Sequence, residues 1–147
     1  MADLIAILDH MRASSGSADT VGLSNDVILD FASRDPTLVQ AIKEGEVRQK
    51  EFASEHLMMD EADLVSHLQQ DFVNFYAPAT INPYVAVAAR GPWIITSHGA
   101  VVHDNGGYGM LGGGHGPEDI IDAMSKNHVM ANVMTPSISH ARLPAAL

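Results

Sequence analysis

Histidine and aspartate side chains that could bind a metal gather in one part of the sequence. His98, His103 and His115 lie close together along the chain, and Asp104 lies among them. Imidazole and carboxylate groups are ligands that zinc and other transition metals take in proteins. However, the sequence contains neither His-x-His nor His-Glu-x-x-His, spacings that bring two imidazoles to one metal. We therefore interpret these histidines as turn and surface residues and keep a metal site as the weaker hypothesis.

Most of the chain's 12 glycines fall between Gly91 and Gly116, and residues 107–112 fit the pattern G-x-G-x-x-G. In dinucleotide-binding folds this pattern joins a strand directly to a helix, with an acidic residue about 20 positions further on. Here the next helix start is Pro117, and the spacing of a βαβ unit is missing. The chain also lacks the Gly-Lys-Ser/Thr of a P-loop. These differences argue against a nucleotide site.

Other reactive groups give weaker signals. Ser137 and Ser139 precede His140, but the Gly-x-Ser-x-Gly elbow of a hydrolase is absent from the sequence. Asp60 and Glu61 stand at a predicted helix start, where acidic side chains interact favourably with the helix dipole. The chain has no cysteine, which excludes disulfides, thiolate chemistry and cysteine-based zinc sites. Residue types alone therefore do not identify a reaction.

The composition is that of a globular protein. Of 147 residues, 46% are hydrophobic and 18% are charged, which is typical of a folded chain rather than a disordered one. The net charge of −10 repels nucleic-acid phosphates, and no cluster of lysine or arginine offsets it. The first residues lack the basic region of a signal peptide, and no apolar run approaches the roughly 20 residues that span a bilayer. We therefore expect a cytoplasmic protein without nucleic-acid or membrane partners.

Helical spacing of apolar residues dominates the first half of the sequence. Asp35, followed by proline, is a strong start signal because aspartate caps a helix and proline fits its first position. Gly45 lies inside the helix that follows and weakens it by about 1 kcal/mol relative to alanine. We expect the charges from Lys43 to Glu55 to form a solvated face, and Met58 and Met59 to fill gaps in the core. The predicted helices cover residues 1–12, 26–33, 36–52 and 60–73.

The period of the sequence changes at about residue 80, where prolines interrupt the helical pattern. Alternating and β-branched residues then predict three short strands, with a hairpin turn at residues 97–100 between the second and the third. A turn at 104–107 leads into the glycine-rich loop, and Pro117 begins a helix. We expect Ile120, Ile121 and Met124 to form the buried face of that helix. The predicted strands cover residues 85–89, 93–96 and 101–103.

The predicted fold class is therefore α+β. Residues 1–80 form a helical N-terminal region. Residues 81–147 form a small antiparallel β-meander, a glycine-rich loop and the helix that follows it.

From Gly99 to Ala123 the sequence resembles the N-terminal part of class III aminotransferases, the pyridoxal phosphate (PLP) enzymes of fold type I. That family has a small β-meander with a glycine, an Asp-x-x-Gly-type turn, and a Leu-Gly-His-x-His-Pro-like loop that leads into a helix. This chain has Gly99, then Asp-Asn-Gly at 104–106, and then Leu-Gly-Gly-Gly-His-Gly-Pro at 111–117. The run Met-Ala-Asn-Val-Met-Thr-Pro-Ser at 130–137 is similar to the family's next segment.

The same comparison shows departures from the family pattern. Gly113 stands where the family has its first histidine, and Gly116 with Pro117 stands for the usual His-Pro. The stretch between the turn and Leu111 is short. The resemblance covers about the last third to half of the chain.

The resemblance implies an enzyme that moves an amino group between an amine or amino acid and a 2-oxo acid, with PLP as the cofactor. It also implies that the Schiff-base lysine, the acid beside the pyridine nitrogen and most phosphate contacts lie further along the family's chain. We therefore expect the N-terminal segment of such a subunit, inactive and without cofactor when alone. Its expected partners are the remainder of the aminotransferase chain and a second subunit of a homodimer. The resemblance places a substrate-side loop at Tyr108, Gly109, Met110, Gly112 and Gly113.

The lysines agree with this expectation. Lys43, Lys50 and Lys126 are the only lysines of the chain, and each lies in a predicted helical context without a matching lysine motif. An alternative function is a non-enzymatic helical module that binds other proteins. Its basis is the apolar helix faces of residues 1–75 and the methionine-rich tail from residue 128 onward.

Overall fold

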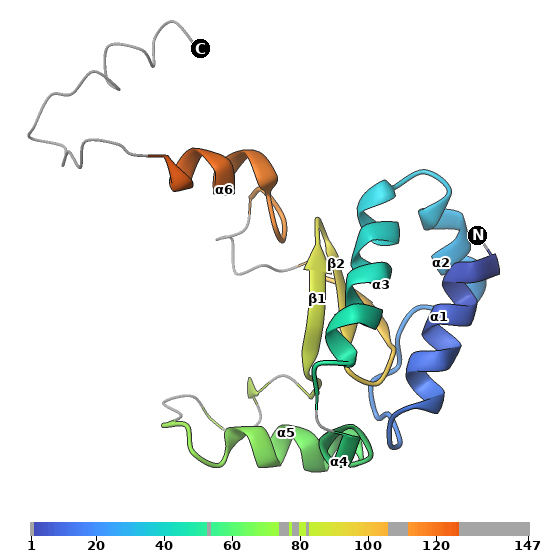
Figure 1. The fold of residues 1–147 in the computed structure, drawn as a ribbon, viewed down its shortest axis with the longest axis vertical. Coiled ribbons are helices and arrows are strands. Elements are labelled where there is room, and N and C mark those ends of the chain that lie inside the picture. The colour runs from blue at the N-terminus through green and yellow to red at the C-terminus, as the bar shows by residue number, and fades with distance from the viewer. Residues whose placement is uncertain are drawn as a thin grey trace, which may run out of the picture. The chain divides into compact units, whose positions relative to one another are not determined.

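The computed structural model describes residues 2–52, 54–73, 77, 80–81, 83–105 and 112–126. The chain forms two compact units, Met1–Pro117 and Glu118–Leu147. The described part has an α+β fold with six helices and one three-stranded antiparallel sheet (Figure 1). This agrees with the predicted class, and the sheet and the helices before it belong to the same unit.

Three helices build the layer beside the sheet. The start predicted at Asp35 is confirmed: its carboxylate accepts a hydrogen bond from the Thr37 amide at 2.9 Å, and Pro36 occupies the first turn. That helix ends at Gln49, three residues before the predicted end, and Phe52 lies beyond it. The three helices are α1 (Ala2–Ala13), α2 (Asn25–Ala32) and α3 (Pro36–Gln49).

Two shorter helices follow, α4 (Ser54–Leu57) and α5 (Glu61–Gln69). Asp60 is the N-cap of α5, and Leu64 on its inner face is fully buried. The expectation that Met58 fills a gap in the core is wrong, because Met58 lies in the turn between the two helices and is 63% exposed.

The sheet is a meander of β1 (Ala86–Arg90), β2 (Trp93–Thr96) and β3 (Val101–His103), in that spatial order. Each neighbouring pair is antiparallel, with Arg90 opposite Trp93 and Ile94 opposite Val102. The two turns use glycines with positive φ, Gly91 at 54° and Gly99 at 73°, a conformation that costs glycine little. The predicted strands and the turn at 97–100 are confirmed.

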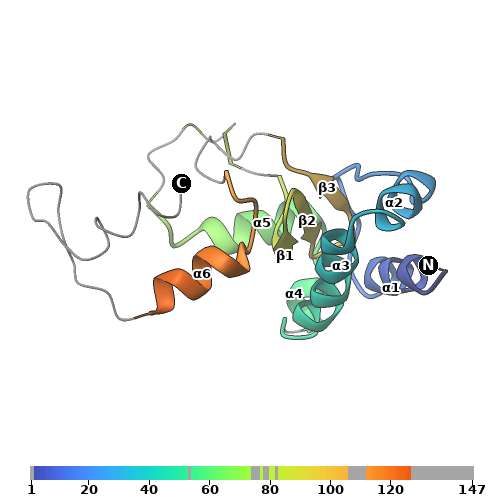
Figure 2. The same cartoon turned by 90° about the horizontal axis from the view of Figure 1, so that it is seen from above.

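Helix α3 packs against β1 and β2, and α1 packs on the other side of α3 (Figure 1, Figure 2). Gly45 is the contact point between α3 and β2: a Cβ there would lie 2.7 Å from Cγ2 of Ile95. The glycine that lowers helix propensity therefore allows the helix to approach the sheet closely. This packing role is not visible in the helical pattern.

A buried amide joins three of these elements. The side-chain nitrogen of Gln49 donates to the carbonyl oxygens of Met11 at 2.9 Å and Ser97 at 2.6 Å. The end of α3 is thereby tied to the end of α1 and to the turn between β2 and β3. The bonds also satisfy a polar group that is only 3% exposed.

In the second unit, α6 (Glu118–Ser125) begins directly after Pro117, as predicted. None of its residues is buried, and Ile120, Ile121 and Met124 are 49%, 54% and 79% exposed. The expected buried face is therefore not found. Among the described helices, none combines the length and apolar character needed to cross a bilayer.

Candidate functional site

The substrate-side loop predicted from the sequence is described in part. Gly112 and Gly113 lie in an exposed turn. Tyr108, Gly109 and Met110 lie outside the described residues. Among the described residues, no atom would lie within 4 Å of a Cβ added at Gly112, so their packing does not require a glycine at this position.

The second half of the loop is bound to the turn between β1 and β2. The His115 amide donates to the Gly91 carbonyl at 2.8 Å, and the Gly91 amide donates to the His115 carbonyl at 2.9 Å. Gly114 has a φ of 74°, and a Cβ there would lie 2.9 Å from Cα of Gly91. Two glycines therefore allow two backbones to meet in an isolated antiparallel bridge.

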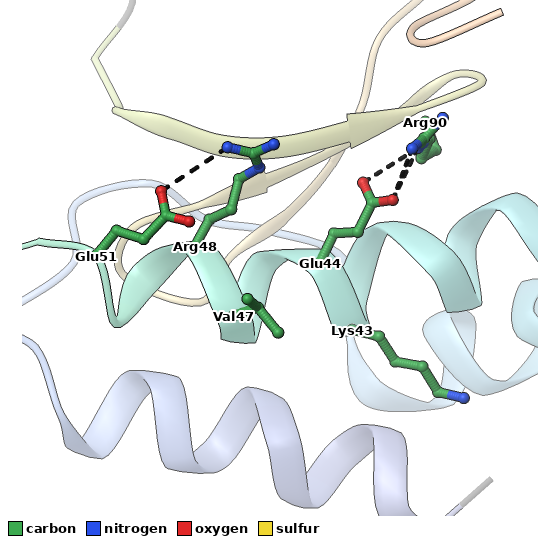
Figure 3. A pocket seen from close by; sticks show the side chains of 6 residues that line it. All are labelled: Lys43, Glu44, Val47, Arg48, Glu51 and Arg90. Carbon is green, nitrogen blue, oxygen red and sulfur yellow. Dashed lines mark hydrogen bonds and ion pairs between the residues drawn. The ribbon is translucent and has the colours of Figure 1, made fainter. Parts of the chain in front are cut away.

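Arg90 braces this loop against α3. Its Nη1 donates to the Gly116 carbonyl at 3.2 Å, while Nη2 and Nε bond the carboxylate of Glu44 at 2.7 and 3.1 Å (Figure 3). Hydrogen bonds from Arg90 lower the pKa of Glu44 against an opposing effect of burial. The forked contact fixes the guanidinium and so holds the carbonyl of Gly116 in place.

A second brace comes from the end of β3. Nε2 of His115 lies 2.9 Å from Oδ2 of Asp104, and the Asp104 amide donates to the Pro92 carbonyl at 2.7 Å. Burial raises the pKa of the Tyr84 hydroxyl, and the negative charge of Asp104 adds to the effect. The sequence placed Asp104 and His115 in turns but did not indicate that they pair, since pairing depends on the loop folding back to Gly91.

The histidines considered as metal ligands have separate partners. His98 lies in a turn, as expected, but the expectation that it is a surface residue is wrong: it is buried, with Nδ1 3.0 Å from Oγ of Ser97 and Nε2 3.0 Å from the Met59 carbonyl. His103 packs edge-on against Trp93, with ring centroids 4.8 Å apart. In the described ranges no group of three or more histidine, cysteine, aspartate or glutamate residues is arranged to hold a metal. The geometry of the described histidines therefore gives the metal hypothesis no support.

The charged face predicted on α3 borders a shallow groove of about 350 Å³. Figure 3 shows Arg48 and Glu44 directed towards the strand and Lys43 directed away from it. Arg48 lies 3.8 Å from Glu51 and both side chains are mostly exposed, so solvent screens this pair. The groove is lined by Lys43, Glu44, Val47, Arg48, Glu51 and Arg90.

Every lysine of the chain is on the surface. Lys43 and Lys50 are exposed residues of the α3 region, and Lys50 pairs with Glu46 at 2.9 Å. Lys126 pairs with Asp122 at 2.6 Å and is also exposed. A Schiff-base lysine is commonly desolvated in an apolar pocket, whereas these three lysines are exposed to solvent.

The described part of the loop, residues 112–116, is thus held by backbone bonds to Gly91 and by the side chains of Arg90 and Asp104. No protein-family model, no curated protein and no solved structure matches this chain.

Proposed function

We propose that this chain is the N-terminal part of a class III PLP-dependent aminotransferase. The order of the described elements supports the proposal. A three-stranded antiparallel meander is followed along the chain by the glycine-rich segment and then by α6. The family resemblance implies this order.

In this proposal the glycine loop lines the substrate side of the active site. The backbone around Gly112 is open towards the described residues, since none of their atoms lies within 4 Å of a Cβ there. Glycine permits close approach of a ligand, and exposed backbone N–H groups can bind a carboxylate such as that of a 2-oxo acid. The bridge between Gly91 and His115 fixes the end of the loop, which reduces the ordering cost on substrate binding.

The residues of this chain do not by themselves fit PLP. The exposed lysines at positions 43, 50 and 126 lack the environment of a Schiff-base lysine. We therefore assign no step of transamination to a residue of this chain. The proposed role is to form one wall of the substrate pocket, while other parts of the enzyme hold the cofactor.

The first test concerns the partner. Co-expression of this chain with the protein segment encoded next to or after it should give a complex that absorbs as a PLP aldimine and transfers amino groups. This chain alone, incubated with PLP and then borohydride, should show no added mass on any lysine. A stable adduct on the isolated chain, or a genomic context without a lysine-bearing segment, would contradict the proposal.

The second test concerns the loop. In the active complex, Gly112→Val should raise KM for the 2-oxo acid without changing the cofactor absorbance, because it adds bulk only to the open side of the loop. Val21→Thr, at a side chain that is 96% exposed, is the control and should leave KM unchanged. An unchanged KM in Gly112→Val would remove the loop from the substrate pocket.

A protein-interaction module is the second candidate, and exposed apolar side chains favour it. Leu68 near the end of α5, and Phe72 and Val73 just after it, are 36%, 71% and 85% exposed. Sedimentation of Phe72→Ser against the natural chain tests whether this surface mediates association. Association that depends on Phe72, together with a genomic context that encodes no lysine-bearing segment, would favour the module over the enzyme.

A further inference from the structure

The carboxylate of Glu61, at the start of α5, is buried, and only one of its two oxygens has hydrogen-bond partners among the described residues. Glu61 has 0% exposure. Its Oε2 accepts hydrogen bonds from the amides of Asp19 at 2.9 Å and Thr20 at 2.7 Å. Its Oε1 is buried and has no hydrogen-bond partner among the described residues. Buried polar atoms are nearly always bonded, so this oxygen requires an explanation.

A second unpaired oxygen lies in the same region. The hydroxyl oxygen of Thr20 is also buried without a partner among the described residues. Its own backbone N–H bonds Oε2 of Glu61, so covalent geometry keeps the hydroxyl within a few ångström of that carboxylate. Two buried oxygens without partners among the described residues thus lie near the contact between the loop before α2 and the start of α5.

Among the described residues, Glu61 has no ion-pair partner, and only backbone amides and the positive end of the α5 dipole offset its charge. The bonds that Oε2 receives come from backbone amides, and the described ion pairs include none with Glu61. Asp60 and Asp63 add negative charge on the same turn of α5. Burying an ionised carboxylate without a positive partner is costly.

The loop cannot easily turn away from this carboxylate. The Ser17 amide and hydroxyl bond Oδ1 of Asp60 at 3.1 and 2.6 Å, and the Glu61 amide donates to the Ser17 carbonyl at 2.9 Å. Gly16 packs so closely on the Met59 carbonyl that a Cβ would lie 2.2 Å from it. These contacts fix the backbone on both sides of the unpaired oxygens.

We propose that a monovalent metal cation, sodium or potassium, binds Oε1 of Glu61 and the hydroxyl oxygen of Thr20. Both donors are oxygen atoms, which suit hard cations rather than zinc or copper. One positive charge balances one buried carboxylate. A divalent ion is a poorer fit, because in the described part of the chain no cluster of three metal-binding side chains is found. The cation ties the loop at residues 17–20 to the start of α5.

The competing explanation is local. A water molecule bound by the two oxygens, or a rotated Thr20 hydroxyl that donates to Glu61, would satisfy the site without an ion. The two explanations differ in one measurable property, since only a bound ion makes stability depend on the identity of the salt cation. A ligand that binds only the folded state raises its stability by mass action.

The test is thermal unfolding of the full chain in sodium, potassium and choline chloride at equal ionic strength. Choline screens the acidic chain equally but is too large for a buried site. We expect unfolding several degrees higher in sodium or potassium than in choline, and the better of the two identifies the ion. Equal temperatures in all three salts would overturn the proposal, and this comparison needs no variant.

Variants locate the ion. Glu61→Gln keeps the shape of the side chain. Its amide oxygen can accept the two backbone N–H bonds, and its NH2 group can donate to the Thr20 hydroxyl. This variant should abolish the dependence of the unfolding temperature on the salt cation. Thr20→Val should weaken the effect. Asp63→Asn, which removes an exposed acid from the same helix, is the matched control and should retain it. A salt-cation effect that survives in Glu61→Gln would place the ion elsewhere and refute this site.

A direct measurement complements the variants. If the salt comparison identifies potassium, which rubidium replaces, crystals grown in rubidium chloride should give an anomalous peak beside Glu61 in the natural protein and none in Glu61→Gln. A peak absent from both, with data that reveal rubidium elsewhere, would contradict the proposal.

Discussion

Gly91 and His115 exchange two backbone hydrogen bonds, at 2.9 and 2.8 Å, although neither belongs to a strand of the sheet. The bridge is a further antiparallel pairing, made at the turn that joins β1 to β2. The second half of the glycine loop is therefore held by the same kind of bond that holds the sheet. Changes at this contact should alter the loop before they alter the rest of the fold.

Gly114→Ala tests this contact. The residue has a φ of 74°, and its new Cβ would lie 2.9 Å from Cα of Gly91. We expect a loss of about 1–3 kcal/mol from the strained backbone, measured by denaturant unfolding. Gly112→Ala is the matched control, because its Cβ meets no atom of the described residues within 4 Å. Equal midpoints for the two variants would contradict the packing described for Gly114.

Glu44→Gln tests the brace through Arg90. The Glu44 side chain is 38% exposed, so solvent screening keeps the loss of stability below about 1 kcal/mol. The loop should respond more clearly: amide hydrogen exchange around Gly116 should become faster, because Arg90 loses the carboxylate that orients it. Glu46→Gln, which removes an exposed pair with Lys50, should leave exchange near Gly116 unchanged. Identical exchange in the two variants would count against the brace.

Asp35→Ala tests the start of α3. The carboxylate of Asp35 caps the helix through Thr37 and accepts the Trp93 ring N–H at 2.7 Å. Losing a cap costs about 0.5–2 kcal/mol, and the variant should also shift the fluorescence of Trp93, the only tryptophan. Asp35→Asn keeps a capping oxygen and should cost less. A variant with unchanged fluorescence would show that Trp93 does not depend on this bond.

Acid should weaken the same contact. Burial alone would raise the pKa of Asp35, but hydrogen bonds from Thr37 and Trp93 outweigh it and leave the pKa lowered. A carboxyl group with a lowered pKa contributes stability above its unfolded pKa of about 3.9, and the contribution is lost as pH falls through the folded value. The stability of the natural chain should therefore fall more steeply below about pH 5 than that of Asp35→Asn. Parallel pH curves for the two proteins would contradict this assignment.

Gly45→Ala tests the contact between α3 and β2. Alanine gains about 1 kcal/mol of helix propensity. Its Cβ would nevertheless lie 2.7 Å from Cγ2 of Ile95, and overpacking of a core costs about 1–3 kcal/mol. We expect a net loss of stability, with Ile95→Ala and Gly45→Ala together less harmful than the sum of the single changes. Additive effects in this double-mutant cycle would show that the two sites do not interact.

Local signals made much of the fold predictable. Asp35 followed by proline gave the start of α3, and the alternation around Trp93 gave the strands, because each depends on neighbouring residues only. The role of Gly45 could not be predicted, since its reason is a side chain on β2 that is 50 residues further along. Helix propensity predicts the free-energy cost of Gly45 in α3. Its close contact with Ile95 explains why a glycine is nevertheless present there.

The candidate site was less predictable for the same reason. The glycine loop was identified from its composition, but Gly91, Arg90 and Glu44 were not connected with it. These residues meet the loop only after the chain has returned to the turn between β1 and β2. The acidic residues at the start of α5 were explained by the helix dipole, which accounts for an exposed acid and not for the burial of Glu61.

Gln49 has a consequence for how the chain folds during synthesis. Its amide bonds Met11 and Ser97, which are 38 and 48 positions away. Helices α1 and α3 therefore leave the ribosome well before the turn that completes this contact exists. Until then their apolar faces lack the sheet that covers them, and partly folded chains expose such surfaces to aggregation. A pause in translation before residue 97 would prolong this exposure, so the chain should depend on chaperones chiefly while β2 and β3 are still being made.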